Sequence, residues 1–162
     1  MTIDKVKIND INEVNSIYER AREYMKETNN PTQWGDSYPP LSLINEDIIK
    51  NRLYGVRDDE KSLVAVFVLS SEEKAYDNCD FWHSNDPFIV IHRVASNGKI
   101  KGITKYIFNY ALTKANYLRI DTHQNNKTMQ NVLIPFGFKE CGIVYYERNN
   151  KIEERIAFDY LH

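Results

Sequence analysis

The sequence has little cysteine, no excess of basic residues and no long apolar run. It contains two cysteines, Cys79 and Cys141, whose separation matches neither a zinc-binding nor a redox motif, which favours a reducing compartment. The formal net charge of -2 argues against a protein built to coat nucleic acid. No apolar run approaches the roughly 20 residues of a membrane-spanning helix, and the first ten residues lack the apolar stretch of a signal peptide. We therefore expect a cytoplasmic protein that binds no membrane, nucleic acid or metal.

What the sequence does contain fits one globular domain over residues 1–162. Hydrophobic residues make up 42% of the chain and charged residues 27%, which is enough apolar surface to form a core without cross-links. No internal repeat and no low-complexity linker divides the chain.

Strand and helix patterns alternate along the first half of the chain. A short strand is predicted for "DKVKI" at 4–8. Capping-box spacing at Asp10 begins a helical pattern that ends before Pro31. After a loop, Ser42 can cap a second helix that runs through "LINEDIIKNRL". A hairpin is predicted for "YGVR" and "SLVAVFVLS", and a polar stretch follows at 71–86.

The second half continues the alternation. The segment "PFIVIHRVAS" at 87–96 is apolar on both faces, as expected for a central strand. It is followed by the turn "NGKIKG", a helix at 103–115, the strand "YLRIDT" and a short helix ending near Pro135. A final hairpin is predicted for "CGIVYYE" and "IEERIAFDYL". The order predicts an α+β protein of three α/β/α layers, with a mixed, mostly antiparallel sheet and helices on both faces.

The turn between the central strand and its helix has the composition of a phosphate site. Such a turn points backbone N–H groups outward at the positive end of the helix dipole. Gly98 and Gly102 leave room for close approach, while Lys99 and Lys101 add positive charge. The stretch matches neither the phosphate loop of nucleotide hydrolases nor the dinucleotide fingerprint. Taken alone, this stretch also fits a turn that only changes the direction of the chain and binds no ligand.

Two motifs in this order resemble the GNAT family of N-acetyltransferases, over essentially the whole chain. The family signature is Arg or Gln, two residues, Gly, one residue, then Gly or Ala. The corresponding stretch begins at Lys99, which replaces the Arg or Gln, and ends at Thr104, which replaces the last position. The second motif is an Asn followed by a short helix and Gly-Phe, and it corresponds to Asn126 and to the pair Gly137 and Phe138.

The resemblance implies that acetyl-CoA binds where the strands "FIVIHRVAS" and "YLRIDT" separate. The pantetheine arm is then expected to pair with the first of these strands, and the pyrophosphate to bind the glycine turn. The residues expected to bind the cofactor are Val94, Ala95, Ser96, Lys99, Ile100, Lys101, Gly102, Ile103, Thr104 and Asn126. Packing in the core is an alternative role for Val94 and Ala95, and the two roles are compatible.

Acetyl transfer to an amine requires a base, and a proton donor for the departing CoA thiolate. In the family this donor is often a tyrosine four residues before the glycine of the Gly-Phe pair, a position held here by Leu133. Tyr145 and Tyr146 alternate along a predicted strand, so one should face inward, and either can replace the missing acid. There are two alternatives: the thiolate departs without a proton donor, or the domain binds acyl-CoA without catalysis.

Candidates for the base lie on the two strands that frame the predicted cofactor site. His92 suits this role, since a histidine ordinarily has a pKa of about 6.5, although a structural histidine is the alternative. Asp121 and His123 share a face if their strand persists, or else belong to a strand-end cap. We expect Arg93 to form an ion pair with a carboxylate rather than bind substrate.

The loop between the first two helices carries Trp34, Asp36 and Tyr38. The resemblance places this loop over the side of the site where the acceptor amine binds. Aromatic faces and a carboxylate suit an amine, whereas Trp34 can also serve only to fill the edge of the core. Cys141 has no readable histidine partner for a role as acyl carrier, and His83 receives no role.

We therefore expect an acetyl-CoA-dependent N-acetyltransferase. It transfers the acetyl group to a primary amine of a small molecule or protein by direct attack on the thioester, with no metal and no covalent enzyme intermediate. A non-catalytic acyl-CoA-binding or sensing module is the alternative, and a phosphate-binding protein of another fold is a third. Homodimer formation and the identity of the acceptor are left open.

Overall fold

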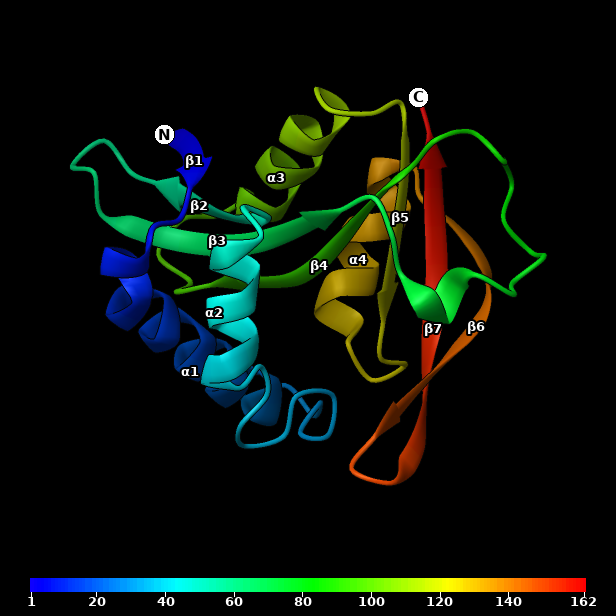
Figure 1. Ribbon diagram of the computed structural model, residues 1–162, viewed down its shortest axis with the longest axis horizontal. Coiled ribbons are helices and arrows are strands. Elements are labelled where there is room, and N and C mark those ends of the chain that lie inside the picture. Colours follow the sequence, from blue (N-terminus) through cyan, green and yellow to red (C-terminus); the bar gives the residue numbers. More distant parts are fainter.

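A mixed sheet of seven strands forms the framework of the protein, and four α-helices cover its faces, in a computed structural model that describes residues 1–162 (Figure 1). The strands are β1 (Thr2–Lys5), β2 (Leu53–Arg57), β3 (Leu63–Ser70), β4 (Ile89–Ser96), β5 (Tyr117–Thr122), β6 (Lys139–Arg148) and β7 (Lys151–Leu161). Their order across the sheet is β1-β2-β3-β4-β5-β7-β6, and only β4 and β5 run parallel to each other. The predicted mixed, mostly antiparallel α/β/α architecture is confirmed.

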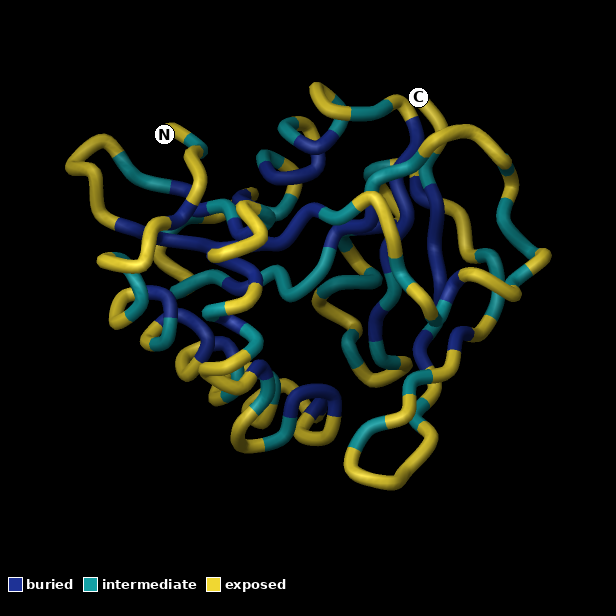
Figure 2. Tube along the Cα trace, in the orientation of Figure 1, coloured by how far each residue is buried: buried dark blue, intermediate teal, exposed yellow.

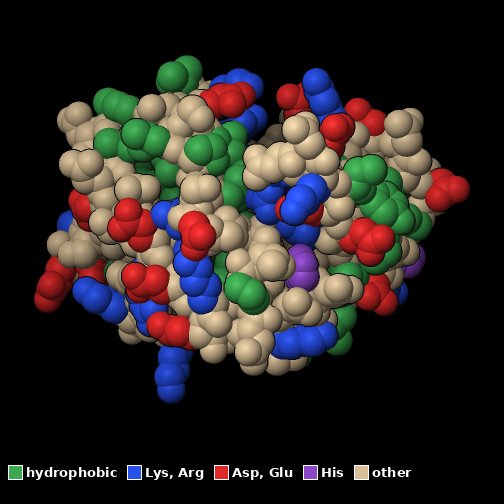
Figure 3. All heavy atoms as spheres, turned by 90° about the horizontal axis from the view of Figure 1, so that it is seen from below, with side chains coloured by type: hydrophobic (Ala, Val, Ile, Leu, Met, Phe, Trp, Pro, Cys, Tyr) green, Lys and Arg blue, Asp and Glu red, His purple; other side chains and the backbone are tan.

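The helices cover both faces of the sheet. They are α1 (Ile11–Glu27), α2 (Leu41–Ile49), α3 (Ile103–Leu112) and α4 (Lys127–Phe136). None of them combines the length and the apolar character needed to cross a membrane. On the face seen in Figure 3, acidic and basic side chains are interspersed, which agrees with the near-neutral net charge.

Alternation along β3 connects the two halves of the core. Val66 and Val68 pack with residues of α1 and α2, whereas Ala65 and Phe67 pack with residues of α3 and α4. The strand is buried from Leu63 to Leu69, as Figure 2 shows, because an uninterrupted apolar run can serve both faces of a covered sheet. The two helical layers therefore follow from the period of two in β3.

The segment between β3 and β4 covers the sheet at β6 and β7. It contains a short 3-10 helix, Lys74–Tyr76, and buries Tyr76 against Val144 and Ala157. The sequence predicts only a polar stretch here, because its polar residues lie between a few widely spaced aromatic side chains.

The beginning of the chain differs from its prediction. The strand expected at 4–8 is formed by Thr2–Lys5, which pairs antiparallel with β2. The chain then enters a 3-10 helix, where the Lys7 N–H donates to the carboxylate of Asp10 at 3.0 Å. The Asp10 side chain therefore caps this short helix rather than α1 itself.

Helix α2 also differs at both of its ends. It begins at Leu41, directly after a proline, so Ser42 is inside the helix and does not cap it. It ends at Ile49, earlier than predicted, because Leu53 belongs to β2 and pairs with Val68.

The sheet opens between β4 and β5. The two strands pair only at Ile89 with Leu118 and at Val90 with Arg119. Beyond these pairs β4 bends: its register with β3 shifts by one residue, and Arg93 has a left-handed φ of 48°. Strand β5 instead stays paired with β7 over its whole length. The strand separation implied by the resemblance is thus present, and it leaves an unpaired strand edge inside the sheet.

Candidate functional site

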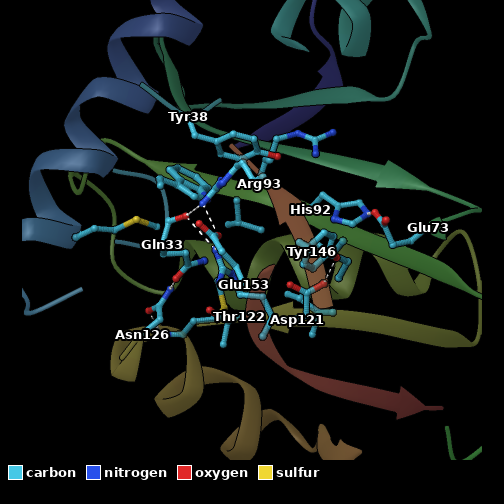
Figure 4. Close-up of a pocket in the computed structure, with 18 of the residues that line it drawn as sticks. Gln33, Tyr38, Glu73, His92, Arg93, Asp121, Thr122, Asn126, Tyr146 and Glu153 are labelled. Carbon is cyan, nitrogen blue, oxygen red and sulfur yellow. Dashed lines mark hydrogen bonds and ion pairs between the residues drawn. The ribbon is translucent and has the colours of Figure 1, made fainter. Parts of the chain in front are cut away.

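A cavity of about 360 Å³ lies where β4 and β5 separate (Figure 4). Its wall is built from β4, β5, the start of α4, the loop after α1 and the hairpin of β6 and β7. Among the predicted site residues, those lining it are Trp34, Tyr38, His92, Val94, Asp121 and Asn126. Asn126 also caps α4, since its side chain accepts the Met129 N–H at 3.0 Å.

His92 is held in the cavity wall by a carboxylate. Its Nε2 atom lies 3.2 Å from Oε2 of Glu73, in the segment before β4. Burial alone would raise the pKa of Glu73, but the hydrogen bond and charge of His92 lower it overall. The carboxylate therefore orients the imidazole ring through Nε2, and Nδ1 is the ring nitrogen that does not contact Glu73.

Asp121 accepts two tyrosine hydroxyl groups and forms no ion pair. Its Oδ2 atom lies 2.5 Å from the hydroxyl of Tyr76 and 2.5 Å from that of Tyr146. Burial and the nearby Asp121 charge raise the pKa of both tyrosines, so both hydroxyls remain protonated donors at neutral pH. Tyr146 faces inward and Tyr145 is exposed, as the alternation predicts. The sequence carries no signal for Tyr76.

His123 lies outside this cavity. Strand β5 ends at Thr122, and His123 lines a second, smaller pocket together with Thr32 and Gln124. Its Nδ1 atom accepts the Asn125 N–H at 3.0 Å. Burial and the charge of a nearby arginine lower its pKa. The structure thus does not bring His123 and Asp121 into one pocket, and a role of His123 in proton transfer stays a prediction.

The residues of the loop after α1 are divided between wall and surface. Trp34 is 8% exposed and packs edge-on against Tyr18 with ring centroids 5.7 Å apart, so it belongs to both core and cavity wall. Tyr38 also lines the cavity. Asp36 is exposed, pairs with Lys26 and does not line the cavity.

Arg93 forms an ion pair with a carboxylate, as predicted. Its guanidinium donates two hydrogen bonds of 2.9 Å to Asp47, whose side chain is 1% exposed. Tyr18 donates its hydroxyl to the Arg93 carbonyl at 3.3 Å, which fixes the bend of β4. This bidentate pair supports the open strand edge rather than a substrate.

The hairpin of β6 and β7 adds polar residues that the sequence analysis missed. Oε2 of Glu153 accepts hydrogen bonds from both Arg148 and Arg155, each at 2.8 Å. The same two guanidinium groups also donate to the backbone carbonyl of Gln33. One signal was available: Glu153 and Arg155 alternate in register with the buried Ala157, so charged side chains occupy inward positions of a strand.

The glycine turn leaves its N–H groups free. Tyr106 donates the first helical bond, to the Gly102 carbonyl at 3.2 Å, and the N–H groups of residues 100–105 have no acceptor within the protein. Gly102 has a φ of 77°, and a Cβ at this position would meet no atom within 4 Å. The turn therefore offers free donors at the N-terminus of α3, with the exposed Lys99 and Lys101 beside them.

The free edge of β4 leads from this turn to the cavity. Ala95 and Ser96 pair with β3 on one side and with no strand on the other. Ala95 is 4% exposed and packs in the core, whereas Val94 lines the cavity. Core packing and backbone pairing are therefore compatible for these residues.

Cys141 has a histidine neighbour, contrary to the sequence analysis. Its Sγ atom lies 3.5 Å from Nδ1 of His83, which lies 2.7 Å from Oδ1 of Asp159. Burial and the Asp159 charge raise the pKa of the thiol, and none of the three residues lines the cavity. Both observations argue against Cys141 as an acyl carrier.

Cys141, His83 and Asp159 offer three ligand atoms within 4.8 Å of one another, a donor set suited to zinc. Hydrogen bonding accounts for the same arrangement, since Oδ2 of Asp159 also accepts from Tyr117 at 2.6 Å and from the His83 N–H at 2.8 Å. The expected absence of a metal stays a prediction.

Asp159 makes the stability of the fold sensitive to acid. Burial alone would raise the pKa of Asp159, but its hydrogen bonds with Tyr117 and His83 lower it overall. Because the folded carboxylate binds its proton less tightly than the unfolded one, the stabilisation is complete above about pH 4 and is lost as the pH falls further. We expect Asp159→Asn to lower the melting temperature at pH 6 and to flatten its decline below pH 4, as measured by circular dichroism. An unchanged acid profile would contradict this.

The same fold occurs in solved structures of acetyltransferases. A GNAT-family acetyltransferase from Streptococcus agalactiae matches with a TM-score of 0.84 and 24% identity, covering 99% of this chain and 95% of that one. A putative acetyltransferase from Staphylococcus aureus matches with a TM-score of 0.71 and 26% identity, covering 99% of both chains. A phosphinothricin acetyltransferase from Sinorhizobium meliloti, in complex with acetyl-CoA, matches with a TM-score of 0.66 at 8% identity, over 99% and 87% of the two chains. No protein-family model and no curated protein sequence matches the chain.

Proposed function

We propose that this chain, which has the fold of the GNAT-family acetyltransferases, is an acetyl-CoA-dependent N-acetyltransferase that acts on a primary amine. One observation carries the proposal. The unpaired edge of β4 connects a turn of free N–H groups to a cavity that contains an unpaired carboxylate. A long ligand with a pyrophosphate at one end and a reactive acyl group at the other fits this arrangement.

In this proposal acetyl-CoA lies between β4 and β5. Its pyrophosphate lies on the turn from Lys99 to Thr104 and accepts hydrogen bonds from the free N–H groups that begin at Ile100. The dipole of α3 and the two lysines favour negative charge there. Its pantetheine amides pair with the backbone from Val94 to Ser96 in the way an added strand does. The acetyl group then enters the cavity near Asp121.

The reaction begins with an ammonium group that must lose a proton before its nitrogen attacks the thioester. Asp121 is the proposed acceptor of this proton, and His92 is the second candidate in the same cavity. The nitrogen forms a bond to the acetyl carbon, an N–H on the free edge of β4 stabilises the oxyanion, and the C–S bond breaks. Direct attack of this kind needs no covalent enzyme intermediate.

Tyr146 is the proposed donor to the departing thiolate. Leu133, at the position of the family tyrosine, is 0% exposed and packs in the core, so that position supplies no acid. The Tyr146 hydroxyl lies 2.5 Å from Asp121, which lets it give its proton to the sulfur and take one back from the protonated carboxyl group. The first proton lost by the nitrogen thus leaves with CoA, and the second, which the nitrogen loses once it is bonded to the acetyl carbon, passes to water.

A non-catalytic acyl-CoA-binding module is the second candidate, favoured by the apolar Leu133. Both candidates predict saturable binding of acetyl-CoA, with ATP binding much more weakly, in a calorimetric titration. Only the enzyme releases free CoA thiol when amines are added, which a thiol reagent detects. Binding without thiol release from any amine would favour the sensing module, and failure to bind acetyl-CoA would overturn both.

A further inference from the structure

We propose that the acceptor is a zwitterion, an amine that also carries a carboxylate several bonds away, and that the carboxylate binds Arg148 and Arg155. This inference rests on the proposed function and names its substrate class. It follows from the arrangement of charges in the cavity, where Asp121, labelled in Figure 4, lies on β5 and the two arginines lie on β6 and β7.

The cationic part of the wall is the hairpin of β6 and β7. Arg148 and Arg155 share a single carboxylate oxygen, Oε2 of Glu153, each at 2.8 Å. Two guanidinium groups with one carboxylate leave one positive charge uncompensated. Both arginine side chains are largely buried, with 23% and 8% of their surface exposed, so this charge is only partly solvated. A further carboxylate is the anion whose planar geometry matches two guanidinium forks.

The anionic part of the wall is formed by Asp121 and Glu73. Asp121 is bound by two neutral hydroxyl groups, which stabilise its charge without neutralising it. Glu73 is paired with His92 across 3.2 Å. A cationic amine beside Asp121 would therefore form an ion pair with the same carboxylate that is proposed to accept its proton.

The other charges that line the cavity do not cancel this polarity. Arg93 forms a bidentate ion pair with Asp47, which lies outside the cavity. Asp47 also binds Arg52 at 2.6 Å, and Arg52 has Glu46 as a second carboxylate partner, so Arg93 adds no negative charge to the wall. Glu147 lines the cavity, but it is exposed and forms no ion pair, so water screens it.

The register of the sheet sets the spacing of the two parts. Asp121 is paired with Ala157 on β7, and Arg155 is two residues before Ala157, which corresponds to roughly 7 Å along the strand. Thr122 lies next to Asp121 on the wall, and its hydroxyl is buried without a hydrogen-bond partner. A polar group of the bound acceptor between amine and carboxylate would satisfy this hydroxyl.

The test compares acceptors that differ only in the carboxylate. Release of CoA thiol is measured with 5-aminopentanoate, with its methyl ester and with pentylamine. We expect kcat/KM to be at least roughly tenfold higher for the free carboxylate, since each hydrogen bond between charged partners contributes about that factor. Similar kcat/KM values for acid, ester and alkylamine would overturn this inference and leave the proposed function standing. No thiol release with any of the three, together with release from other primary amines, would overturn this inference alone, whereas no release from any amine would overturn both.

An arginine variant then assigns the effect to its residue. In Arg148→Gln the ratio of kcat/KM between acid and ester should fall toward one. In the control Arg20→Gln the ratio should be unchanged, because Arg20 is also an ion-paired arginine but pairs with Glu23 and Glu27 on the exposed surface of α1 and does not line the cavity. An unchanged ratio in Arg148→Gln, or an equal fall in both variants, would contradict the assigned role of Arg148.

Discussion

Replacing Asp121 with asparagine is expected to lower kcat by about 10²- to 10⁴-fold, the range typical for the loss of a general base. The amide has the shape of the carboxyl group and can still accept a tyrosine hydroxyl, but it cannot take a proton from the amine. Asp121 lies on β5 and is not part of the β4 edge proposed to hold pantetheine. The dissociation constant of acetyl-CoA should therefore change less than about twofold. Steady-state thiol release and calorimetric titration measure the two quantities.

Two further variants make this prediction specific. Asp59→Asn removes a carboxylate that is 95% exposed and does not line the cavity, so its kcat should be unchanged. His123→Ala tests the histidine of the "DTH" segment, which does not line the cavity but lines the smaller pocket that shares Glu153 and Arg155 with it. A full kcat in Asp121→Asn together with a large loss in His123→Ala would transfer the role of base to the histidine. Full activity in both would remove the segment from the mechanism.

The fold was predictable because periodicity is a local property. The uninterrupted apolar run of β3 and the helical spacing in α1 can each be read from fewer than about 20 adjacent letters. Apart from the missed 3-10 helix Lys74–Tyr76, the errors lie at element ends, where contacts from elsewhere decide the outcome. Leu53 is one example: its pairing with Val68 takes it from the predicted helix into β2.

The candidate site was predictable only where a motif marks it. The glycine turn and Asn126 belong to such motifs, and both occupy the expected places. Tyr76 and Glu153 have no motif, because they reach the cavity through the fold of segments distant in sequence. The proximity of His83 and Cys141 arises in the same way, across 58 residues of sequence. Pairings of this kind depend on topology, which composition and spacing do not encode.

Replacing Gly102 with leucine is expected to weaken acetyl-CoA binding by at least about 100-fold. The N–H groups of residues 100–105 are free, and hydrogen bonds from such groups to a phosphate contribute about 1.5 to 3 kcal/mol each. A side chain at this position keeps the pyrophosphate from approaching them. The fold should survive, because a new Cβ would meet no atom within 4 Å. The left-handed φ of 77° alone should cost about 1 to 2 kcal/mol of stability.

Gly35 provides the matched control for backbone strain. Its φ is 60°, and a Cβ there would also meet no atom within 4 Å, but it lies in the loop after α1, away from the glycine turn. Gly35→Leu should therefore lose a similar amount of stability in urea denaturation while keeping its affinity for acetyl-CoA in the calorimeter. An equal loss of affinity in both variants would trace the effect to strain. Unchanged affinity in Gly102→Leu would mean that the turn only changes the direction of the chain and that the pyrophosphate binds elsewhere.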